Sequence, residues 1–189
     1  MKGKIKIIGI GGSPERNSSS LFYLAYVLSE LKQIGAEVKL LDIRKVKLPL
    51  YDYSKGLAAA GKGFKKILDE IHSADGYVFS SPEYHGTVSS SFKNVIDYLE
   101  FLYDYSPPYL TGKPAGLIAA GGAENSGVTT LGTMVNIVHS LRGVVASSSI
   151  AIGSAYKHID ENGEIKNESL KRKLKRLADE VYNLSVKLK

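Results

Sequence analysis

Short apolar runs alternate with longer amphipathic segments along most of the chain. Five runs are nearly continuously apolar or rich in β-branched residues, a pattern typical of strands covered on both faces. They span residues 4–10, 37–43, 76–81, 115–120 and 144–152. Elsewhere apolar residues recur at three- and four-residue steps, which predicts helices. These helices are expected over residues 19–34, 62–73, 89–103, 127–142 and 167–188.

Two of the helical segments have a clear apolar face. In the segment 89–103 this face consists of Phe92, Val95, Ile96, Leu99 and Leu102. Ser89 or Ser90 is suited to cap its N-terminus. In the segment 167–188 the face consists of Leu170, Leu174, Leu177, Val181, Leu184 and Leu188. Both patterns predict a helix that packs one side on the core and exposes the other to water.

Strands that alternate with helices predict an α/β domain with a parallel sheet and helices on both faces. The length of 189 residues fits a single domain over residues 1–189. Of the two doubly wound strand orders, the flavodoxin-like order 2-1-3-4-5 suits five strands best. Such sheets bind ligands beyond the carboxyl ends of the strands. Three polar, glycine-containing loops are predicted there, at residues 11–20, 81–88 and 120–127.

Composition narrows the chemistry. The chain has no cysteine, which excludes disulfides, thiolate catalysis and cysteine-ligated clusters. Its four histidines, at positions 72, 85, 139 and 158, lack metal-ligand spacing, so we expect no metal. No apolar run approaches the roughly 20 residues that span a bilayer. The N-terminal apolar run is too short for a signal peptide. We therefore expect a cytoplasmic protein without a membrane partner.

The charge balance is basic, with a formal net charge of +6 and a pI of about 9.3. Much of the excess lies in the C-terminal segment 166–189, where a solvated helix face explains it. A nucleic-acid-binding module is the alternative, and it predicts binding that weakens steeply with salt. We expect no nucleic-acid partner.

The first loop, "GGSPERNSSS", favours a phosphate ligand. It lacks the third glycine of a dinucleotide fingerprint and the Gly-Lys-Ser/Thr of a nucleoside-triphosphate loop. Hydroxyl side chains, backbone N–H groups and the positive end of a helix suit a terminal phosphate monoester. The residues that supply these groups are Ser13, Arg16, Asn17, Ser18, Ser19 and Ser20. A serine-rich capped helix start is the alternative, although it would need only one or two of them.

The second loop contains "SPEYHG". Pro82 restricts the exit from the third strand, and Gly86 permits close backbone approach or a positive φ. The rings of Tyr84 and His85 could stack on an isoalloxazine, or they could simply fill the loop. His85 alone is typical of a surface histidine.

The motif "PEYHGT" followed by "SSFKNVIDYL" closely resembles the NADPH-dependent FMN reductase family. That family has the pattern Pro-Glu-Tyr-(Asn/His)-Gly-(Ser/Thr) and then Leu-Lys-Asn-Ala-(Ile/Leu)-Asp-(Trp/Tyr)-Leu. "GSPERNSSSL" is similar to its phosphate loop, and "GKPAGLIAAGGAENSGVTTL" to its fourth strand and third loop. The resemblance spans roughly residues 4–150.

The resemblance implies an FMN site. Ser13, Arg16, Ser18, Ser19 and Ser20 would hold the phosphate; the isoalloxazine would lie along Pro82, Glu83, Tyr84, His85 and Gly86, with Gly121 and Gly122 at its other edge. Lys93, Asn94 and Asp97 would brace a loop or an oligomer contact. No side chain is assigned as a catalytic acid or base.

The chain departs from the family pattern in two places. Glu15 stands where relatives most often have arginine, with Arg16 one position later, so we expect Glu15 to face solvent or pair with a base. Ser90, Ser91 and Phe92 replace a common Gly-x-Leu.

The implied activity is hydride transfer from NADPH or NADH to FMN, and then to a small acceptor, by a ping-pong mechanism. Family acceptors are flavins, quinones, azo compounds and metal oxyanions. The alternative is a flavodoxin-type electron carrier, against which the basic pI and the "SPEYHG" loop both count. The family implies a homodimer or homotetramer. The aromatic segment 99–110 would be a contact, or it would cover the domain's own core.

Overall fold

The structure is a computed structural model that describes residues 3–189. The strands are β1 (Lys6–Gly11), β2 (Glu37–Asp42), β3 (Gly76–Tyr84), β4 (Thr87–Val88), β5 (Pro114–Ala120), β6 (Val144–Val145) and β7 (Ile150–Ile152). The helices are α1 (Ser19–Gln33), α2 (Ile43–Val46), α3 (Phe64–Ser73), α4 (Ser90–Asp97), α5 (Val128–Ser140) and α6 (Glu168–Leu188). Short 3-10 helices occupy Tyr53–Lys55, Leu57–Ala60, Tyr98–Leu102 and Ala155–His158.

The sheet has the predicted parallel, flavodoxin-like arrangement. Its order is β2-β1-β3-β5-β6, and β7 continues the outer position beside β5. All these pairings are parallel. The number of strands differs from the prediction of five, because the expected fifth strand is divided into β6 and β7. A further short strand, β4, pairs antiparallel with the end of β3.

A polar turn divides the fifth strand. Glu180 of α6 accepts hydrogen bonds from the N–H of Ser147 at 2.9 Å and the N–H of Ser148 at 2.7 Å. The hydroxyl of Ser149 accepts one from the N–H of Leu117 at 3.0 Å. Burial raises the pKa of Glu180, but its hydrogen bonds to the two serines outweigh that effect and lower the pKa to about 2. The Ser149 hydroxyl therefore replaces a backbone acceptor beside β5, and Glu180 satisfies the N–H groups of the turn.

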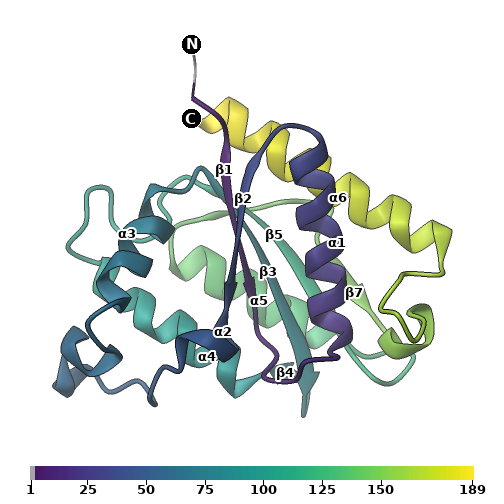
Figure 1. Cartoon of the computed structure of the whole chain (residues 1–189), viewed down its shortest axis with the longest axis horizontal. Coiled ribbons are helices and arrows are strands. Elements are labelled where there is room, and N and C mark those ends of the chain that lie inside the picture. Colours follow the sequence, from purple (N-terminus) through teal and green to yellow (C-terminus); the bar gives the residue numbers. More distant parts are fainter. Residues whose placement is uncertain (1–2) are drawn as a thin grey trace.

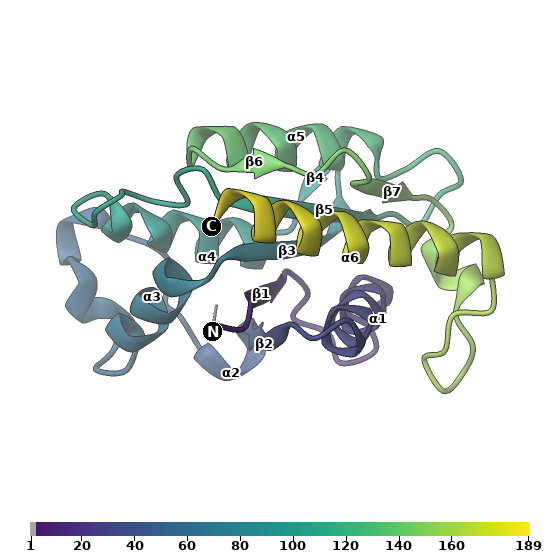
Figure 2. The same ribbon diagram turned by 90° about the horizontal axis from the view of Figure 1, so that it is seen from above.

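Helices cover both faces of the sheet (Figures 1 and 2). On one face α1 and α6 pack together on a core that includes Leu24, Val78 and Leu177. On the other face α3, α4 and α5 enclose a core that includes Phe79 and Phe92. Glycine 9 and glycine 116 lie directly under leucines of α1 and α6, where a Cβ would stand 2.7 Å and 2.9 Å from leucine methyl carbons.

The two predicted amphipathic helices pack as expected. The five residues of the apolar face predicted within residues 89–103 are all buried. The Ser89 hydroxyl accepts the N–H of Phe92 at 3.1 Å, so Ser89 is the cap. In α6, Leu170, Leu174, Leu177 and Val181 are buried, whereas Leu188 at the end is 52% exposed. Within residues 3–189, no helix is both long and apolar enough to cross a bilayer.

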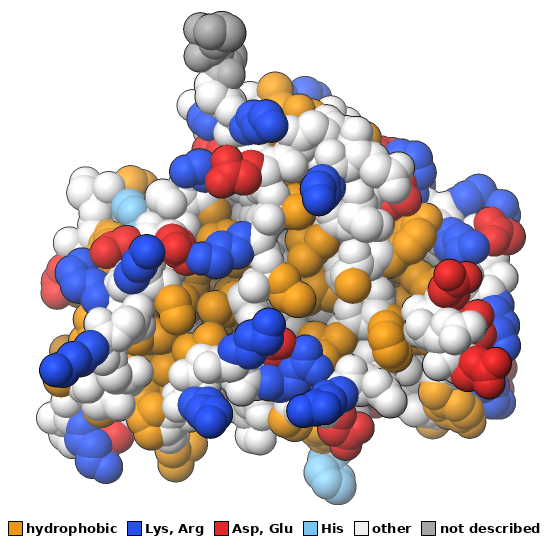
Figure 3. All heavy atoms as spheres, viewed as in Figure 1, with side chains coloured by type: hydrophobic (Ala, Val, Ile, Leu, Met, Phe, Trp, Pro, Cys, Tyr) orange, Lys and Arg blue, Asp and Glu red, His pale blue; other side chains and the backbone are white. Residues whose placement is uncertain are grey.

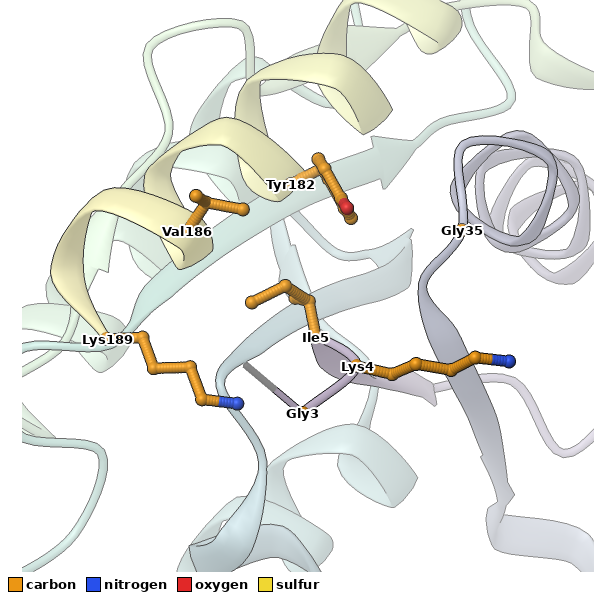
Figure 4. Close-up of a pocket in the computed structure, with 7 residues that line it drawn as sticks. All are labelled: Gly3, Lys4, Ile5, Gly35, Tyr182, Val186 and Lys189. Atoms are coloured by element: carbon orange, nitrogen blue, oxygen red, sulfur yellow. The ribbon is translucent and has the colours of Figure 1, made fainter. Parts of the chain in front are cut away.

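A cavity of about 560 Å³ lies at the amino ends of the strands (Figure 4). The side chains of Ile5, Tyr182 and Val186 surround it, and Lys189 stands at its rim. Lys189 pairs there with Asp75 at 3.0 Å. The full length of the sheet separates this cavity from the polar loops at the carboxyl ends.

Candidate functional site

The three predicted loops lie together at the carboxyl ends of β1, β3 and β5, at the lower edge of the molecule in Figure 1. These are adjacent parallel strands, so their following loops share one edge. The switch in strand order lies between β1 and β3, where a ligand site is expected in this fold.

In the first loop, three hydroxyls are directed inward. Ser13, Ser18 and Ser20 are buried, whereas residues 14–17 are exposed. The hydroxyls of Ser18 and Ser20 lie 2.9 Å apart, and the Ser13 hydroxyl accepts the N–H of Glu15 at 3.2 Å. Ser18 is the N-cap residue of α1, yet its side chain makes no capping hydrogen bond. The first turn of α1 therefore keeps free N–H donors beside a cluster of hydroxyls, which fits a phosphate group.

Glu15 faces solvent, one of the two outcomes expected for it. Arg16 is also exposed, and within residues 3–189 neither side chain takes part in an ion pair. The Arg16 guanidinium is thus available to an anion at this loop.

Buried hydrogen bonds tie the first loop to the second. Gly12 donates its N–H to the carbonyl of Ser80 at 2.7 Å, and the Ser80 hydroxyl donates to the carbonyl of Ser20 at 2.7 Å. The Ser89 hydroxyl donates to the carbonyl of Gly12. A Cβ at Gly12 would lie 2.6 Å from Cβ of Phe92, so only glycine allows this approach.

The second loop is a tight hairpin between β3 and β4. Tyr84 pairs with Thr87, and the two residues between them, His85 and Gly86, have φ angles of 51° and 78°. Two consecutive positive φ angles define a type I′ turn, which favours Asn or Gly but admits His at its first position. Tyr84 is 44% exposed, and His85 is exposed beside it. Both rings are therefore accessible to a ligand.

The side chain of Glu83 extends from the hairpin to the start of α5. Its Oε2 accepts the N–H of Gly127 at 2.8 Å and the hydroxyl of Thr130 at 2.9 Å, both at the start of α5. The expectation that Glu83 lies along the flavin ring stays a prediction; in the structure its backbone belongs to the hairpin and its side chain contacts α5. No local pattern marks this contact, because its partners are more than forty residues away.

The two glycines of the third loop differ in their surroundings. A Cβ on Gly121 would lie 2.5 Å from Cβ of Ser126 and 3.0 Å from the nitrogen of Gly127. A Cβ on Gly122 would have nothing within 4 Å. Gly121 is therefore required by the turn itself, and Gly122 borders open space at the edge of the sheet.

The motif residues on α4 act as braces. Asn94 accepts the N–H of Tyr51 and donates to the carbonyl of Pro49, each at 2.8 Å, which fixes the segment that follows α2. Lys93 pairs with Asp97 at 2.6 Å along the helix. Asn94 thus braces the segment that follows α2, whereas Lys93 and Asp97 pair within their own helix; a role of these residues in an oligomer contact stays a prediction.

Basic side chains gather on the lower middle of the face in Figure 3, over α2 and the ends of β1 and β2. Arg44 is already occupied there, because it makes two hydrogen bonds of 2.7 Å with Asp42. These hydrogen bonds hold the pKa of Asp42 below its ordinary value. Lys45 and Lys47 are exposed. In the described part of the chain, no three His, Asp or Glu residues lie together as a metal site would require.

Comparison with known proteins identifies the family of this chain. A sequence model of the NADPH-dependent FMN reductase family matches residues 5–157. An NADPH azoreductase of Bacillus sp. (strain OY1-2) is 29% identical over 147 residues, covering 76% of this chain and 72% of the relative. An NAD(P)H-dependent FAD/FMN reductase of Geobacillus thermodenitrificans is 26% identical over 190 residues, covering 98% and 96%.

Among solved structures, the flavoenzyme NAD(P)H:(acceptor) oxidoreductase FerB of Paracoccus denitrificans has a TM-score of 0.77 at 21% identity, covering 97% of this chain and 98% of that one. A WrbA-like flavodoxin of Agrobacterium tumefaciens has a TM-score of 0.64 at 16% identity, covering 99% and 100%. These two likenesses establish the flavodoxin-like fold.

The chain belongs to the NADPH-dependent FMN reductase family. It is an NAD(P)H-dependent flavin oxidoreductase whose cofactor is FMN.

Proposed function

We propose that the protein transfers hydride from NAD(P)H to FMN held at the carboxyl edge of the sheet, and then reduces a small acceptor. The observation that carries this proposal is the convergence of an uncapped, hydroxyl-lined helix start with an exposed aromatic hairpin across the β1–β3 switch point. One loop suits a phosphate and the other a flat ring.

The first loop would bind the phosphate. Uncharged donors are available there: the hydroxyls of Ser13, Ser18 and Ser20 and the first N–H groups of α1. Ser19 and Asn17 add polar groups at the same turn, and Arg16 adds the one positive charge of this loop. Neutral donors would thus carry most of the recognition, and Arg16 would add to it electrostatically.

The second and third loops would flank the ring. Pro82, Tyr84, His85, Gly86 and the backbone of Glu83 would line one side, with Gly121 and Gly122 at the other edge. When bound, FMN supplies the redox chemistry by accepting a hydride from a nicotinamide and returning electrons to an acceptor. The protein contributes placement, since no side chain at this edge is required as an acid or base.

The acceptor is proposed to be a flavin, quinone, azo compound or metal oxyanion. An azo acceptor is supported by the NADPH azoreductase of Bacillus sp. and the FMN-dependent NADPH-azoreductases of Staphylococcus aureus, the latter 29% identical over 155 residues. Donor and acceptor would use the same exposed ring face in turn, which predicts ping-pong kinetics.

We also propose that residues 1–189 form one FMN-binding domain that works in the cytoplasm as a homodimer or homotetramer. Within the segment 99–110, Leu99, Leu102 and Leu110 are buried in this chain's own core, whereas Tyr103 is 60% exposed. Most of the exposed residues of the segment lie in its 103–107 turn, where only Tyr105 is half-buried. Sedimentation that yields only monomer would remove the oligomer proposal.

Steady-state kinetics separate this reductase from a flavodoxin-type carrier. The FMN-loaded protein is given NADPH and a quinone, with no other reductase present. Continuous NADPH oxidation that depends on the quinone supports the proposal. Absence of turnover, together with electron exchange when a partner reductase is added, would indicate a carrier.

A further inference from the structure

Glu83 caps a helix to which it does not belong. Its carboxylate oxygen Oε2 accepts two hydrogen bonds at the N-terminus of α5, from Gly127 N–H at 2.8 Å and from the Thr130 hydroxyl at 2.9 Å. Thr130 is fully buried, so its hydroxyl has a protein partner only because Glu83 reaches it. A buried hydroxyl left without a partner is unfavourable, because it has lost its hydrogen bond to water without replacement.

Helix α5 supplies no such group itself. Its N-cap residue is Gly127, which has φ of 95° and no side chain, and its first turn holds no acidic residue. Helix N-termini favour negative charge because their free N–H groups and the helix dipole are positive there. The carboxylate of Glu83 meets this need from the neighbouring loop.

The contact joins the two proposed walls of the ring site. The backbone of Glu83 pairs with Val88 inside the hairpin, directly before the exposed Tyr84. Gly127 ends the third loop, which begins at Gly121 and Gly122. One half-buried side chain therefore fixes the distance between the aromatic hairpin and the glycine edge.

We propose that Glu83 is a positioning residue that sets the width of the flavin-ring site before FMN binds. This inference rests on the proposed function, since it assumes that the ring lies between the hairpin and the third loop. Glu83 acts through Gly127 and Thr130 and does not react. Its loss lets the hairpin and α5 separate, which weakens FMN binding and changes the environment of the bound ring.

The test compares Glu83→Ala, Glu83→Gln, Thr130→Val and Thr130→Ser with wild type. Glu161→Ala, which removes an exposed carboxylate from a distant turn, is the matched control. FMN affinity is measured by fluorescence titration, and the visible circular dichroism and single-turnover reduction rate are measured at saturating FMN. Thermal unfolding of each apo-protein checks the fold.

The expected order follows the hydrogen bonds that each variant keeps. Glu83→Ala binds FMN at least about tenfold more weakly, which corresponds to one lost charge-assisted hydrogen bond. Glu83→Gln is intermediate, because the amide oxygen still accepts. Thr130→Val binds FMN more weakly than wild type, and Thr130→Ser binds it with nearly wild-type affinity. At saturation, Glu83→Ala and Thr130→Val have altered visible dichroism and slower reduction, and Glu161→Ala matches wild type.

Three results would overturn the proposal, and each has a different meaning. If wild type binds FMN and folded Glu83→Ala has the same affinity, dichroism and reduction rate, Glu83 has no positioning role. If Glu83→Ala is unfolded, the comparison of Thr130→Val with Thr130→Ser takes its place. Equal FMN affinity of these two variants then contradicts the proposal. If wild type binds no FMN at all, the proposed function fails and this inference fails with it.

Discussion

The hydroxyl of Ser89 donates a hydrogen bond to the carbonyl oxygen of Gly12, across 77 positions of sequence. Both residues are buried, and the same hydroxyl accepts the N–H of Phe92 at 3.1 Å as the cap of α4. One side chain therefore links the phosphate-type loop to the helix that follows the aromatic hairpin. Hydrogen bonds within the folded chain therefore fix the distance between the first loop and α4.

Replacement of Ser89 by alanine is expected to destabilise the protein by about 1–3 kcal/mol. The variant loses a helix cap and leaves the buried carbonyl of Gly12 without this partner. Urea unfolding followed by circular dichroism measures the change. Ser90→Ala is the control, because Ser90 is exposed one residue later and does not cap the helix. Equal midpoints for Ser89→Ala and Ser90→Ala would contradict the assignment.

Alanine at Gly121 should lower the stability of the fold, whereas alanine at Gly122 should weaken FMN binding only. Gly121→Ala forces a Cβ to within 3.0 Å of backbone and is expected to lower the melting temperature. Gly122→Ala has open space and should fold like wild type, yet bind FMN more weakly, because the ring is proposed to fill that space. Differential scanning fluorimetry with and without FMN measures both effects. Unchanged FMN binding by Gly122→Ala would remove Gly122 from the proposed site.

The phosphate loop can be tested by comparing FMN with riboflavin, which lacks the phosphate. The double variant Ser18→Ala/Ser20→Ala should bind FMN at least about tenfold more weakly than wild type does. Its affinity for riboflavin should be unchanged. Arg16→Ala should weaken FMN less and reduce the salt dependence of its affinity. Glu15→Ala, which removes a negative charge from the same loop, should bind FMN at least as tightly as wild type.

If the double variant loses affinity for FMN and for riboflavin equally, these serines support the loop without contacting phosphate. Isothermal titration calorimetry at two salt concentrations distinguishes the two cases.

Glu180 predicts a defined pH dependence of stability. Its pKa in the folded protein is lowered to about 2 by the hydrogen bonds at the Ser147–Ser149 turn. A pKa lower in the folded than in the unfolded chain adds stability above the unfolded value of about 4.3, and this stability is lost as pH falls from there towards 2. The contribution at neutral pH is about 1–3 kcal/mol.

The measurement is urea unfolding of wild type and Glu180→Gln between pH 7 and pH 3. The stability difference between them should be constant at neutral pH and shrink below about pH 4.5. A difference that stays constant over the whole range would contradict the lowered pKa.

The sequence predicts the helices because they follow from local periodicity, and it predicts the sheet order because alternating strands and helices leave only two doubly wound orders. Division of the fifth strand is not predictable in that way, because "VVASSSIAI" is apolar at both ends. The turn inside it depends on Glu180, which comes from α6 on the face of the sheet. The hairpin β3–β4 could have been predicted, since His85–Gly86 is a polar residue followed by glycine at a two-residue turn.

The sequence predicts which loops form the candidate site, but it does not predict the hydrogen bonds between them. The loop serines and the hairpin rings lie at the expected edge, because parallel strands bring their carboxyl ends together. The direction of the Glu83 side chain could not be predicted, since it depends on where α5 begins.

The most direct test of the central claim is anaerobic reduction of FMN bound to the purified wild-type protein. The protein is saturated with FMN, freed of unbound cofactor by gel filtration and mixed with NADPH without oxygen. We predict that FMN stays with the protein stoichiometrically, that NADPH bleaches its visible absorbance, and that a quinone added afterwards restores it. Protein that retains no flavin, or bound flavin that NADPH does not bleach, would contradict the account.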